Sequence, residues 1–197
     1  MENYRTEPVP EEQPVKKSAR SGCVGFAVDT LETVLLALIL FLGINAVSDR
    51  VRVENISMQP SLYSGEFVLV NKLAYKLGSP HIGDIIVFPY PKDPQEKYIK
   101  RVIGLPGDTV RIANGTVYVN NQALDEPYIA QPPNYPGTWT VPEGQLFVLG
   151  DNRNQSSDSH VWGFVSINQV VGKALVIYWP LDKLQILGYT EVVKASP

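Results

Sequence analysis

The sequence predicts a mainly β protein, with an antiparallel β-sandwich or barrel-like domain, a small β-hairpin extension and one N-terminal transmembrane helix. The helix is indicated by the single long apolar run, residues 24–47, whose core at residues 33–47 carries no charge. The β domain is indicated by the chain beyond residue 51, where apolar residues alternate with polar ones between closely spaced turns. Many short strands joined by close turns favour antiparallel pairing over a parallel sheet.

The composition of the 197 residues excludes several classes of function. The net charge of −3 is spread without a basic stripe, so we expect no nucleic-acid partner. The single cysteine, Cys23, excludes an intrachain disulfide. One cysteine and two histidines, His81 and His160, have no zinc-ligand spacing, so no metal site is expected.

The first 22 residues are typical of a disordered tail, because prolines alternate with glutamates and almost no apolar residue is present. Basic residues flank the apolar run unequally. Four precede it (Arg5, Lys16, Lys17 and Arg20) and two follow it (Arg50 and Arg52). The positive-inside rule therefore predicts a cytoplasmic N-terminus and an extracytoplasmic body.

Residues 24–47 are interpreted as a transmembrane anchor. Asp29 and Glu32 lie one helical turn apart and would share a face near one membrane surface. A cleavable secretory signal is the alternative, since a basic stretch precedes the run and Ala-Val-Ser at residues 46–48 fits a cleavage site. The long acidic tail, with Asp29 and Glu32, argues against that alternative.

Eight strands are expected after the apolar run, and Asn114-Gly115 predicts a tight hairpin turn between two of them. Short helical turns are expected at residues 62–63 and 73–77. Residues 126–143 are rich in proline and are interpreted as a surface loop or as a loop that shapes a substrate groove. The expected strands are residues 51–54, 66–72, 84–88, 98–103, 109–112, 116–119, 145–149 and 172–178.

Ser57 lies in the polar segment Asn-Ile-Ser-Met-Gln-Pro-Ser-Leu, residues 55–62, directly after the first expected strand. Two interpretations are open for this serine. It caps a short helical turn, which is the commonest role of serine in such a place, or it is a nucleophile. The segment alone does not decide between them.

Lys100 lies in an expected strand, where alternate residues point to the same side. It therefore shares a face with Tyr98 and Val102, whereas Arg101 points the opposite way. On such a face the amine is poorly solvated, which lowers its pKa and lets it accept a proton from a serine hydroxyl. The alternative is an edge-strand lysine whose amine extends to water.

Two further segments place polar residues beside expected strands. Gly-Asp-Ile-Ile-Val-Phe at residues 83–88 is a turn that enters a buried strand. Gly-Asp-Asn-Arg-Asn-Gln-Ser-Ser-Asp-Ser-His-Val-Trp-Gly at residues 150–163 follows another strand, and so many small polar residues predict a hydrogen-bonded loop.

Taken in order behind an N-terminal anchor, four segments resemble the successive sequence boxes of bacterial-type signal peptidase I. They are SMQPSL, GDIIVF, KRVIGLPGD and GDNRNQSSDSHVWG, and the resemblance covers residues 30–180. This family, also called the leader peptidase family, consists of membrane-bound Ser-Lys endopeptidases. Each box alone is a weak signal, whereas four in the right order are specific.

The resemblance implies the roles of individual residues. Ser57 corresponds to the nucleophile and Lys100 to the general base. Ser156 corresponds to the hydroxyl that orients the lysine amine, and Asp158 to a nearby structural carboxylate. The remaining correspondences support the site: Met58 and Pro60 shape the active-site turn, and Asp151, Asn152 and Arg153 begin the last box.

The resemblance also implies the fold's division and the reaction. The catalytic β domain would comprise residues 51–108 and 145–190, with residues 109–144 as a reduced second subdomain. Such enzymes remove signal peptides from exported preproteins after small residues at −1 and −3, through an acyl-enzyme and without a cofactor. The expected partners are therefore preproteins and the lipid bilayer, beside the secretion translocon. The expected location is the plasma or thylakoid membrane, crossed once, with the catalytic domain extracytoplasmic.

Two residues depart from the family pattern. His160 stands where the family often has arginine, so either Arg101 or neutral His160 is expected to partner Asp158. Asn55 stands where many members have serine or glycine. The backbone N–H of Ser57 would supply one donor to the oxyanion, and we expect the Asn55 amide to supply the second.

Two other classes of protein remain compatible with parts of the pattern. One is the soluble, self-cleaving repressor type of Ser-Lys protease. The other is an anchored β-rich binding module, in which Ser57 caps a turn and Lys100 is a surface charge.

Overall fold

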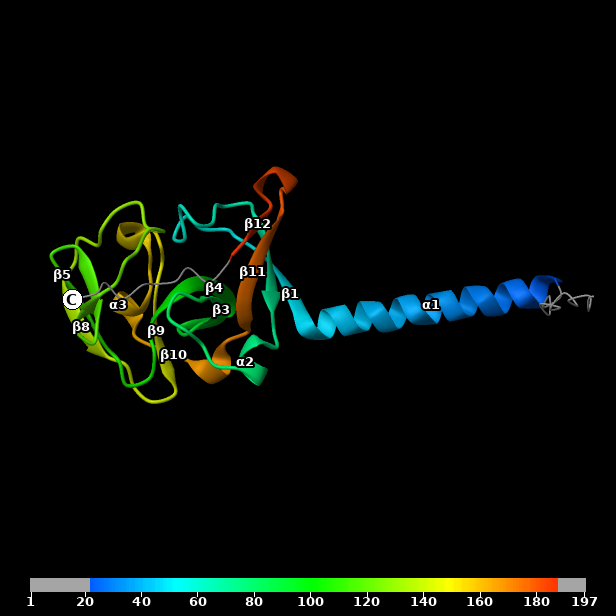
Figure 1. The fold of residues 1–197 in the computed structure, drawn as a ribbon, viewed down its shortest axis with the longest axis horizontal. Coiled ribbons are helices and arrows are strands. Elements are labelled where there is room, and N and C mark those ends of the chain that lie inside the picture. The colour runs from blue at the N-terminus through cyan, green and yellow to red at the C-terminus, as the bar shows by residue number, and fades with distance from the viewer. Residues whose placement is uncertain (1–21, 188–197) are drawn as a thin grey trace, which may run out of the picture. The chain divides into compact units, whose positions relative to one another are not determined.

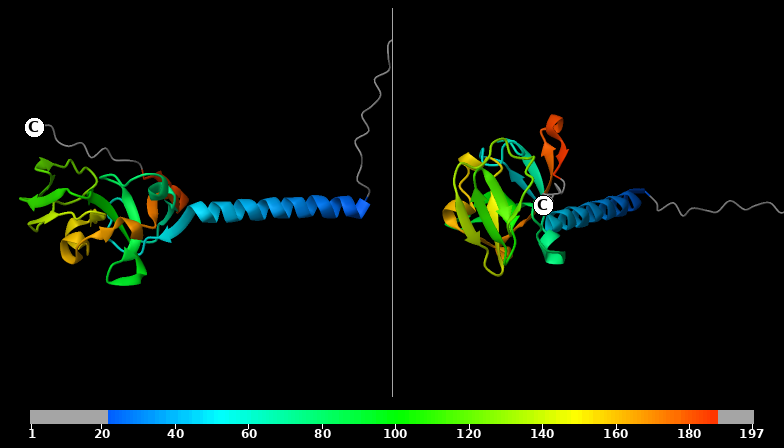
Figure 2. Two further views of the ribbon diagram at one scale, coloured as in Figure 1. Left: turned by 90° about the horizontal axis from the view of Figure 1, so that it is seen from below. Right: turned by 60° about the vertical axis from the view of Figure 1, so that its left-hand side comes forward.

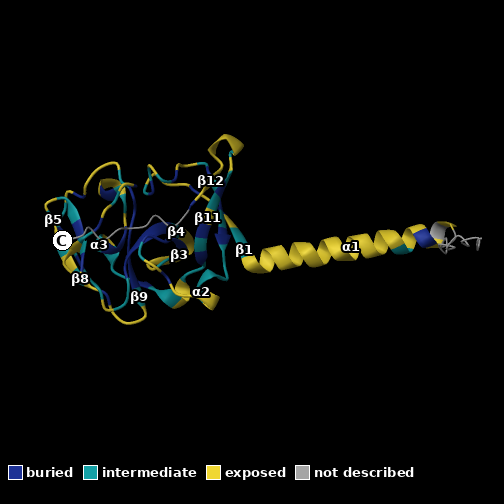
Figure 3. Cartoon of the chain, in the orientation of Figure 1, coloured by how far each residue is buried: buried dark blue, intermediate teal, exposed yellow. Residues whose placement is uncertain are grey.

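The computed structural model describes residues 22–187, and the chain divides into two units, residues 1–43 and 44–197. The tail expected to be disordered therefore lies outside the described residues, except for Gly22. Helix α1 (Gly22–Val47) is apolar on every side, and its apolar side chains are exposed along its length (Figure 3). A helix that is apolar all round and exposes its apolar side chains is suited to lipid. Among the described residues, only this helix is long and apolar enough to span a membrane.

The larger sheet has eight strands, and every pairing in it is antiparallel (Figure 1). Its order is β1-β2-β11-β3-β4-β9-β10, with β12 added to β11. The sheet confirms the expected antiparallel β fold. Its strands are β1 (Ser48–Arg52), β2 (Phe67–Asn71), β3 (Ile85–Tyr90), β4 (Asp93–Gly104), β9 (Gln145–Leu149), β10 (Val165–Ser166), β11 (Gly172–Trp179) and β12 (Gln185–Ile186).

A second sheet of four strands, in the order β7-β6-β5-β8, is built from the chain between β4 and β9. Positive φ angles at Asn114 and Gly115 confirm the hairpin turn between β5 and β6. In Figure 1 and the left view of Figure 2, this sheet lies at the end of the β domain away from β1. Its strands are β5 (Thr109–Ala113), β6 (Thr116–Val119), β7 (Gln122–Ala123) and β8 (Gly137–Thr140).

Helices in the β domain are short. The helical turn expected at residues 73–77 is α2 (Ala74–Leu77). The one expected at residues 62–63 is wrong: no helix forms there, and the Leu62 N–H instead closes a turn on the Met58 carbonyl at 2.9 Å. The other short helices are η1 (Arg153–Gln155), α3 (Ser159–Trp162), η2 (Ile167–Gln169) and η3 (Leu181–Lys183).

Strand β4 lies between β3 and β9 in the larger sheet, and its last six residues are all buried. Ile99, Val102 and Ile103 each belong to a different one of three apolar clusters in the core. Burying each such side chain contributes roughly 1.5–3 kcal/mol to folding. The backbone of Lys100 and Arg101, between these residues, is therefore held by packing and by pairing with β3, and at Arg101 by pairing with β9 as well.

Candidate active site

Ser57 lies in the turn that follows β1, beside Lys100 of β4. Met58, the next residue, is 1% exposed and packs in the same apolar cluster as Leu62. The turn also contains Pro60, and the Gln59–Pro60 peptide bond is cis. The buried Met58 side chain fixes the turn and leaves Ser57 facing the neighbouring strand.

Lys100 meets Ser57 from β4. Its Nζ atom lies 2.7 Å from Ser57 Oγ and 3.1 Å from the carbonyl oxygen of Ile99, and the whole residue is only 3% exposed. The expected partner of the serine is therefore in hydrogen-bond contact with it. No buried carboxylate accepts a hydrogen bond from this amine among the described residues.

Burial lowers the pKa of Lys100 from 10.5 to about 8, because the charged ammonium loses its hydration. The charges of Asp158 and Asp151 act in the opposite direction and limit the decrease. A pKa near 8 leaves a substantial neutral fraction in mildly alkaline water, and that form has a lone pair to accept a proton.

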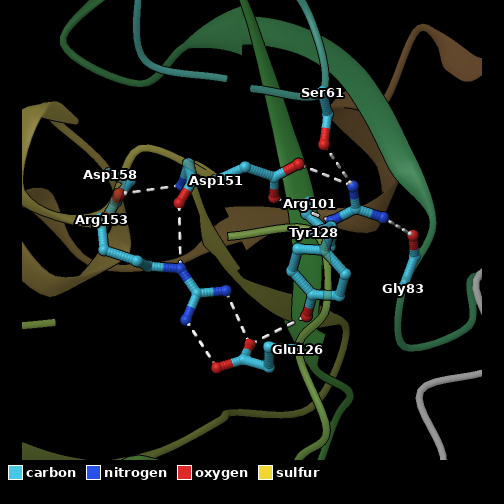
Figure 4. Close-up of polar contacts among 9 residues, drawn as sticks. Ser61, Gly83, Arg101, Glu126, Tyr128, Asp151, Arg153 and Asp158 are labelled. Carbon is cyan, nitrogen blue, oxygen red and sulfur yellow. Dashed lines mark hydrogen bonds and ion pairs between the residues drawn. The ribbon is translucent and has the colours of Figure 1, made fainter. Parts of the chain in front are cut away.

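Arg101 points away from Lys100, as strand alternation predicts. Its guanidinium forms a two-pronged ion pair with Asp151, with Nε–Oδ1 at 2.8 Å and Nη2–Oδ2 at 2.6 Å, and donates to the Gly83 carbonyl (Figure 4). The expectation that Arg101 partners Asp158 is therefore wrong. Asp151 is fully buried next to Arg101 and provides both carboxylate oxygens to the guanidinium.

Asp158 pairs with His160, which was the other expected arrangement. The Nδ1 atom of His160 lies 2.6 Å from Asp158 Oδ1, and the Gly150 N–H donates to Oδ2 at 3.0 Å. The ring of His160 also stacks on Tyr135, with 3.9 Å between centroids. Asp158 thus ties the start of the 150–163 loop to its far end.

The loop that begins at Gly150 contacts the Ser57 turn directly. The N–H of Asn152 donates to the Ser57 carbonyl at 3.0 Å, and its side-chain amide donates to the Ile56 carbonyl at 3.2 Å. Arg153 is 1% exposed and donates from Nε to the Gly150 carbonyl. Asn152 therefore holds the backbone of the Ser57 turn, and Arg153 closes the loop on Gly150.

Gly150 is required by close packing. A β-carbon at this position would collide with both the hydroxyl of Ser156 and the carbonyl oxygen of Ser57. The Ser156 hydroxyl is buried here without a hydrogen-bond partner, so the bond expected between it and the Lys100 amine is not formed. Ser156 lies close to the serine turn, yet it does not orient the amine in this conformation.

Asn55 is exposed and borders an open cleft of about 600 Å³ that also contains Ser57 and Lys100. The cleft runs between the β1 end and the β4 segment at residues 95–100. A smaller hollow of about 250 Å³ also includes Asn55, Ser57 and Lys100, and Gln155 and Ser157 contribute to its lining. The Asn55 amide is thus free to face a substrate that reaches the nucleophile.

Two buried contacts of the site were not expected from the sequence. Glu126 binds Arg153, and Tyr128 covers Arg101. Both belong to the proline-rich segment, in which the only signal was an acidic and an aromatic residue on either side of Pro127. Within residues 22–187, no group of three or more His, Cys, Asp or Glu side chains is placed to hold a metal ion.

Comparison with known proteins gives consistent similarities. Residues 27–179 match the family described as signal peptidase, peptidase S26. A probable signal peptidase I-2 of Synechocystis sp. is 42% identical over 84% of this chain and 81% of its own. A signal peptidase I of Leptolyngbya laminosa is 38% identical over 95% of this chain and 98% of its own. The thylakoidal processing peptidase 1 of Arabidopsis thaliana is 34% identical over 71% of this chain and 44% of its own.

Proposed function

Because the chain belongs to the signal peptidase family, peptidase S26, we propose that Ser57 is its nucleophile and Lys100 its general base. The chain is a serine endopeptidase of the signal peptidase I type and acts on exported preproteins. This membership excludes the repressor-type protease and the binding module as alternatives. The 2.7 Å contact between Lys100 Nζ and Ser57 Oγ is the observation that supports the assignment of the pair.

The reaction begins when neutral Lys100 takes the hydroxyl proton of Ser57 as Oγ attacks the scissile carbonyl carbon. The tetrahedral intermediate collapses to an ester on Ser57, and the Lys100 ammonium gives its proton to the leaving amine. Neutral Lys100 then activates a water molecule, which hydrolyses the ester and releases the second product. No cofactor takes part in any of these steps.

The oxyanion of each tetrahedral intermediate needs donors aimed at the developing charge. We assign these to the Ser57 N–H and the Asn55 side-chain amide, since both residues border the cleft. A preprotein bound in extended form in this cleft places its −1 and −3 side chains on the same face. Both side chains would then meet the same wall of the cleft, and we attribute the preference for small residues at these two positions to that wall.

The chain is membrane-associated, and we propose that α1 crosses the membrane once with its N-terminus cytoplasmic. The excess of basic residues before the helix supports this orientation. The catalytic domain would then meet preproteins on the extracytoplasmic side of a plasma or thylakoid membrane, beside the translocon. Protease treatment of intact vesicles from the native membrane tests the orientation of the chain. Separation of plasma and thylakoid membranes by fractionation tests its location.

Cleavage of a preprotein by the purified full-length chain tests the pair. Ser57→Ala and Lys100→Met should each abolish cleavage, because one removes the attacking oxygen and the other removes the base. Ser64→Ala and Lys76→Met are matched controls, since both side chains are exposed outside the cleft, and they should retain activity. Full activity of Ser57→Ala or Lys100→Met would overturn the proposal.

A further inference from the structure

Glu126 and Tyr128, in the segment between β7 and β8, lie against two buried arginines of the active-site domain (Figure 4). Tyr128 is 9% exposed, although the residues on either side of it are more accessible. A surface loop has no packing reason to send an acidic and an aromatic side chain into the same polar network. The contacts of the two residues indicate what they do.

Glu126 neutralises Arg153. Its two carboxylate oxygens accept from Nη1 and Nη2 of Arg153 at 2.8 and 2.6 Å, and the Glu126 side chain is 6% exposed. The hydroxyl of Tyr128 donates to the same carboxylate at 2.8 Å. Arg153 in turn donates from Nε to the Gly150 carbonyl at 3.0 Å. The carboxylate of Glu126 therefore binds the loop that contacts Ser57 directly, through Arg153.

Tyr128 covers Arg101. The guanidinium carbon of Arg101 lies 3.9 Å from the centroid of the Tyr128 ring, which is a close cation–π stack. The edge of the same guanidinium binds Asp151 through two hydrogen bonds. The ring thus closes one face of the Arg101–Asp151 pair against water, so the charges of the pair attract each other more strongly.

Both contacts converge on residues 150–153, which hold the backbone of the nucleophile. Asp151 lies between Gly150, which abuts the Ser57 carbonyl, and Asn152, which donates to that carbonyl. Movement of this loop would move the Ser57 turn relative to β4. The Lys100–Ser57 contact therefore depends on the position of the loop.

We propose that Glu126 and Tyr128 are positioning residues of the reaction, which fix residues 150–153 and through them the distance and burial of the Ser57–Lys100 pair. The proline-rich segment is then a clamp on the active site as well as a surface loop. The inference rests on the proposed roles of Ser57 and Lys100. It adds to them two residues that touch neither the substrate nor the reacting atoms.

The charge balance of the network supports this role. Burial and the neighbouring carboxylate of Glu126 raise the pKa of Tyr128, so its hydroxyl remains a neutral donor. Burial alone would lower the pKa of Arg153, but the hydrogen bonds and charge of Glu126 raise it. Two arginines and two carboxylates, Asp151 and Glu126, therefore form a buried neutral set that removal of Glu126 would leave with excess positive charge.

The test compares Tyr128→Ala, Tyr128→Phe and Glu126→Gln in the full-length protein with a preprotein substrate. Tyr128→Ala should lower kcat by about 10 to 100-fold with little change in KM, because Ser57 and Lys100 would be displaced relative to each other by up to about an ångström. It should also move the acid limb of the pH profile to higher pH, since water that reaches Lys100 restores part of its ordinary pKa. Tyr128→Phe keeps the ring over Arg101 and should recover most of kcat, and Glu126→Gln should lower kcat while preserving the shape of the side chain.

Tyr118→Ala is the matched control, because Tyr118 stacks on Arg111 at 4.1 Å in the four-stranded sheet, outside the network. It should lower the melting temperature without changing kcat or the acid limb. The proposal is overturned if Tyr128→Ala and Glu126→Gln behave like this control. If Tyr128→Ala does not fold, Glu126→Gln alone decides by the same criterion. Failure of Ser57→Ala to abolish cleavage would instead refute the nucleophile assignment, so the two failures are distinguishable.

Discussion

The Lys100 amine and the Ser57 hydroxyl are 2.7 Å apart, and the lysine side chain is withdrawn from water. In the ammonium form Nζ donates this hydrogen bond. In the neutral form the bond can reverse, so that the Ser57 O–H donates to the lone pair of the amine, which is the geometry of general-base catalysis. The same contact therefore serves both protonation states, and the pKa of Lys100 decides which one is populated.

The pH dependence of cleavage should report this pKa. Burial lowers the pKa of Lys100 to about 8, and only the neutral amine acts as a base. We therefore expect kcat/KM to rise with pH through about 8 and to level off above it. Initial rates on a preprotein, measured in a constant-ionic-strength buffer series, give the profile. If the rise in kcat/KM instead had its midpoint near pH 6 or near pH 10.5, Lys100 would not be a base whose pKa is lowered by burial.

Stability should change in the opposite direction from activity in Lys100→Met. A pKa lowered from 10.5 in the unfolded chain to about 8 in the folded chain costs up to about 3 kcal/mol of folding free energy when the pH is below 8. That cost shrinks as the pH rises from 8 to 10.5, where the unfolded chain also loses the proton. The inactive Lys100→Met variant should thus be more stable than the parent at pH 7, by an amount that falls toward pH 10.

Urea unfolding of both proteins at pH 7 and pH 10 measures this difference. The hydrogen bonds that Lys100 makes to Ser57 and to the Ile99 carbonyl reduce the gain, since methionine cannot replace them. The pH dependence of the difference is therefore the more telling quantity. A difference in the free energy of unfolding that does not change between the two pH values would show that burial does not lower the pKa of Lys100.

Much of the fold could be predicted from the alternation of apolar and polar residues. Strands β6 and β9 begin and end as expected, because each has a regular pattern between clear turns. Strand β1 begins at Ser48 rather than residue 51, since its pairing with β2 extends back to Asn71. Four short strands (β7, β8, β10 and β12) were missed, because two to four residues carry too little periodicity and their pairing is set by tertiary contacts.

The site could be predicted in part. Alternation on β4 separated Lys100 from Arg101, and this held because β3 pairs with β4 in unbroken register from Tyr98 to Arg101. The choice of carboxylate for Arg101 depended on how the 150–163 loop folds back, which no local pattern encodes. Asp151 lies two residues beyond the end of β9 and reaches Arg101 on the neighbouring strand β4, whereas Asp158 lies beyond a turn and pairs with His160.

Replacement of Asn55 should test the oxyanion assignment. If its amide donates to the developing charge, Asn55→Ala should lower kcat by roughly 10 to 1000-fold while KM changes little. Gln95→Ala is a suitable control, since Gln95 is an exposed amide in the same cleft but on β4. Preprotein cleavage under saturating substrate measures the effect. Equal kcat values for Asn55→Ala and the parent would remove Asn55 from the mechanism.

The packing around Gly150 predicts the effect of adding one methyl group there. In Gly150→Ala the new β-carbon would collide with the Ser57 carbonyl and with Ser156, and neither can retreat easily, because the Ser57 carbonyl is held by Asn152 and the Ser156 hydroxyl is buried. The loop or the serine turn must therefore shift, and a shift of this kind costs about 100-fold in rate when it separates the reacting groups. The folded variant should also be less stable, by about 1–3 kcal/mol as for other overpacked sites.

Gly144→Asn is the matched control for Gly150→Ala, since a β-carbon at Gly144 meets open space and asparagine tolerates the positive φ angle of 71° there. Both variants would be compared by kcat on a preprotein and by urea unfolding. We expect Gly144→Asn to retain the parent's kcat and most of its stability. A Gly150→Ala enzyme with the parent's kcat would mean that the 150–153 loop can move without displacing Ser57, and the coupling between that loop and the nucleophile would have to be abandoned.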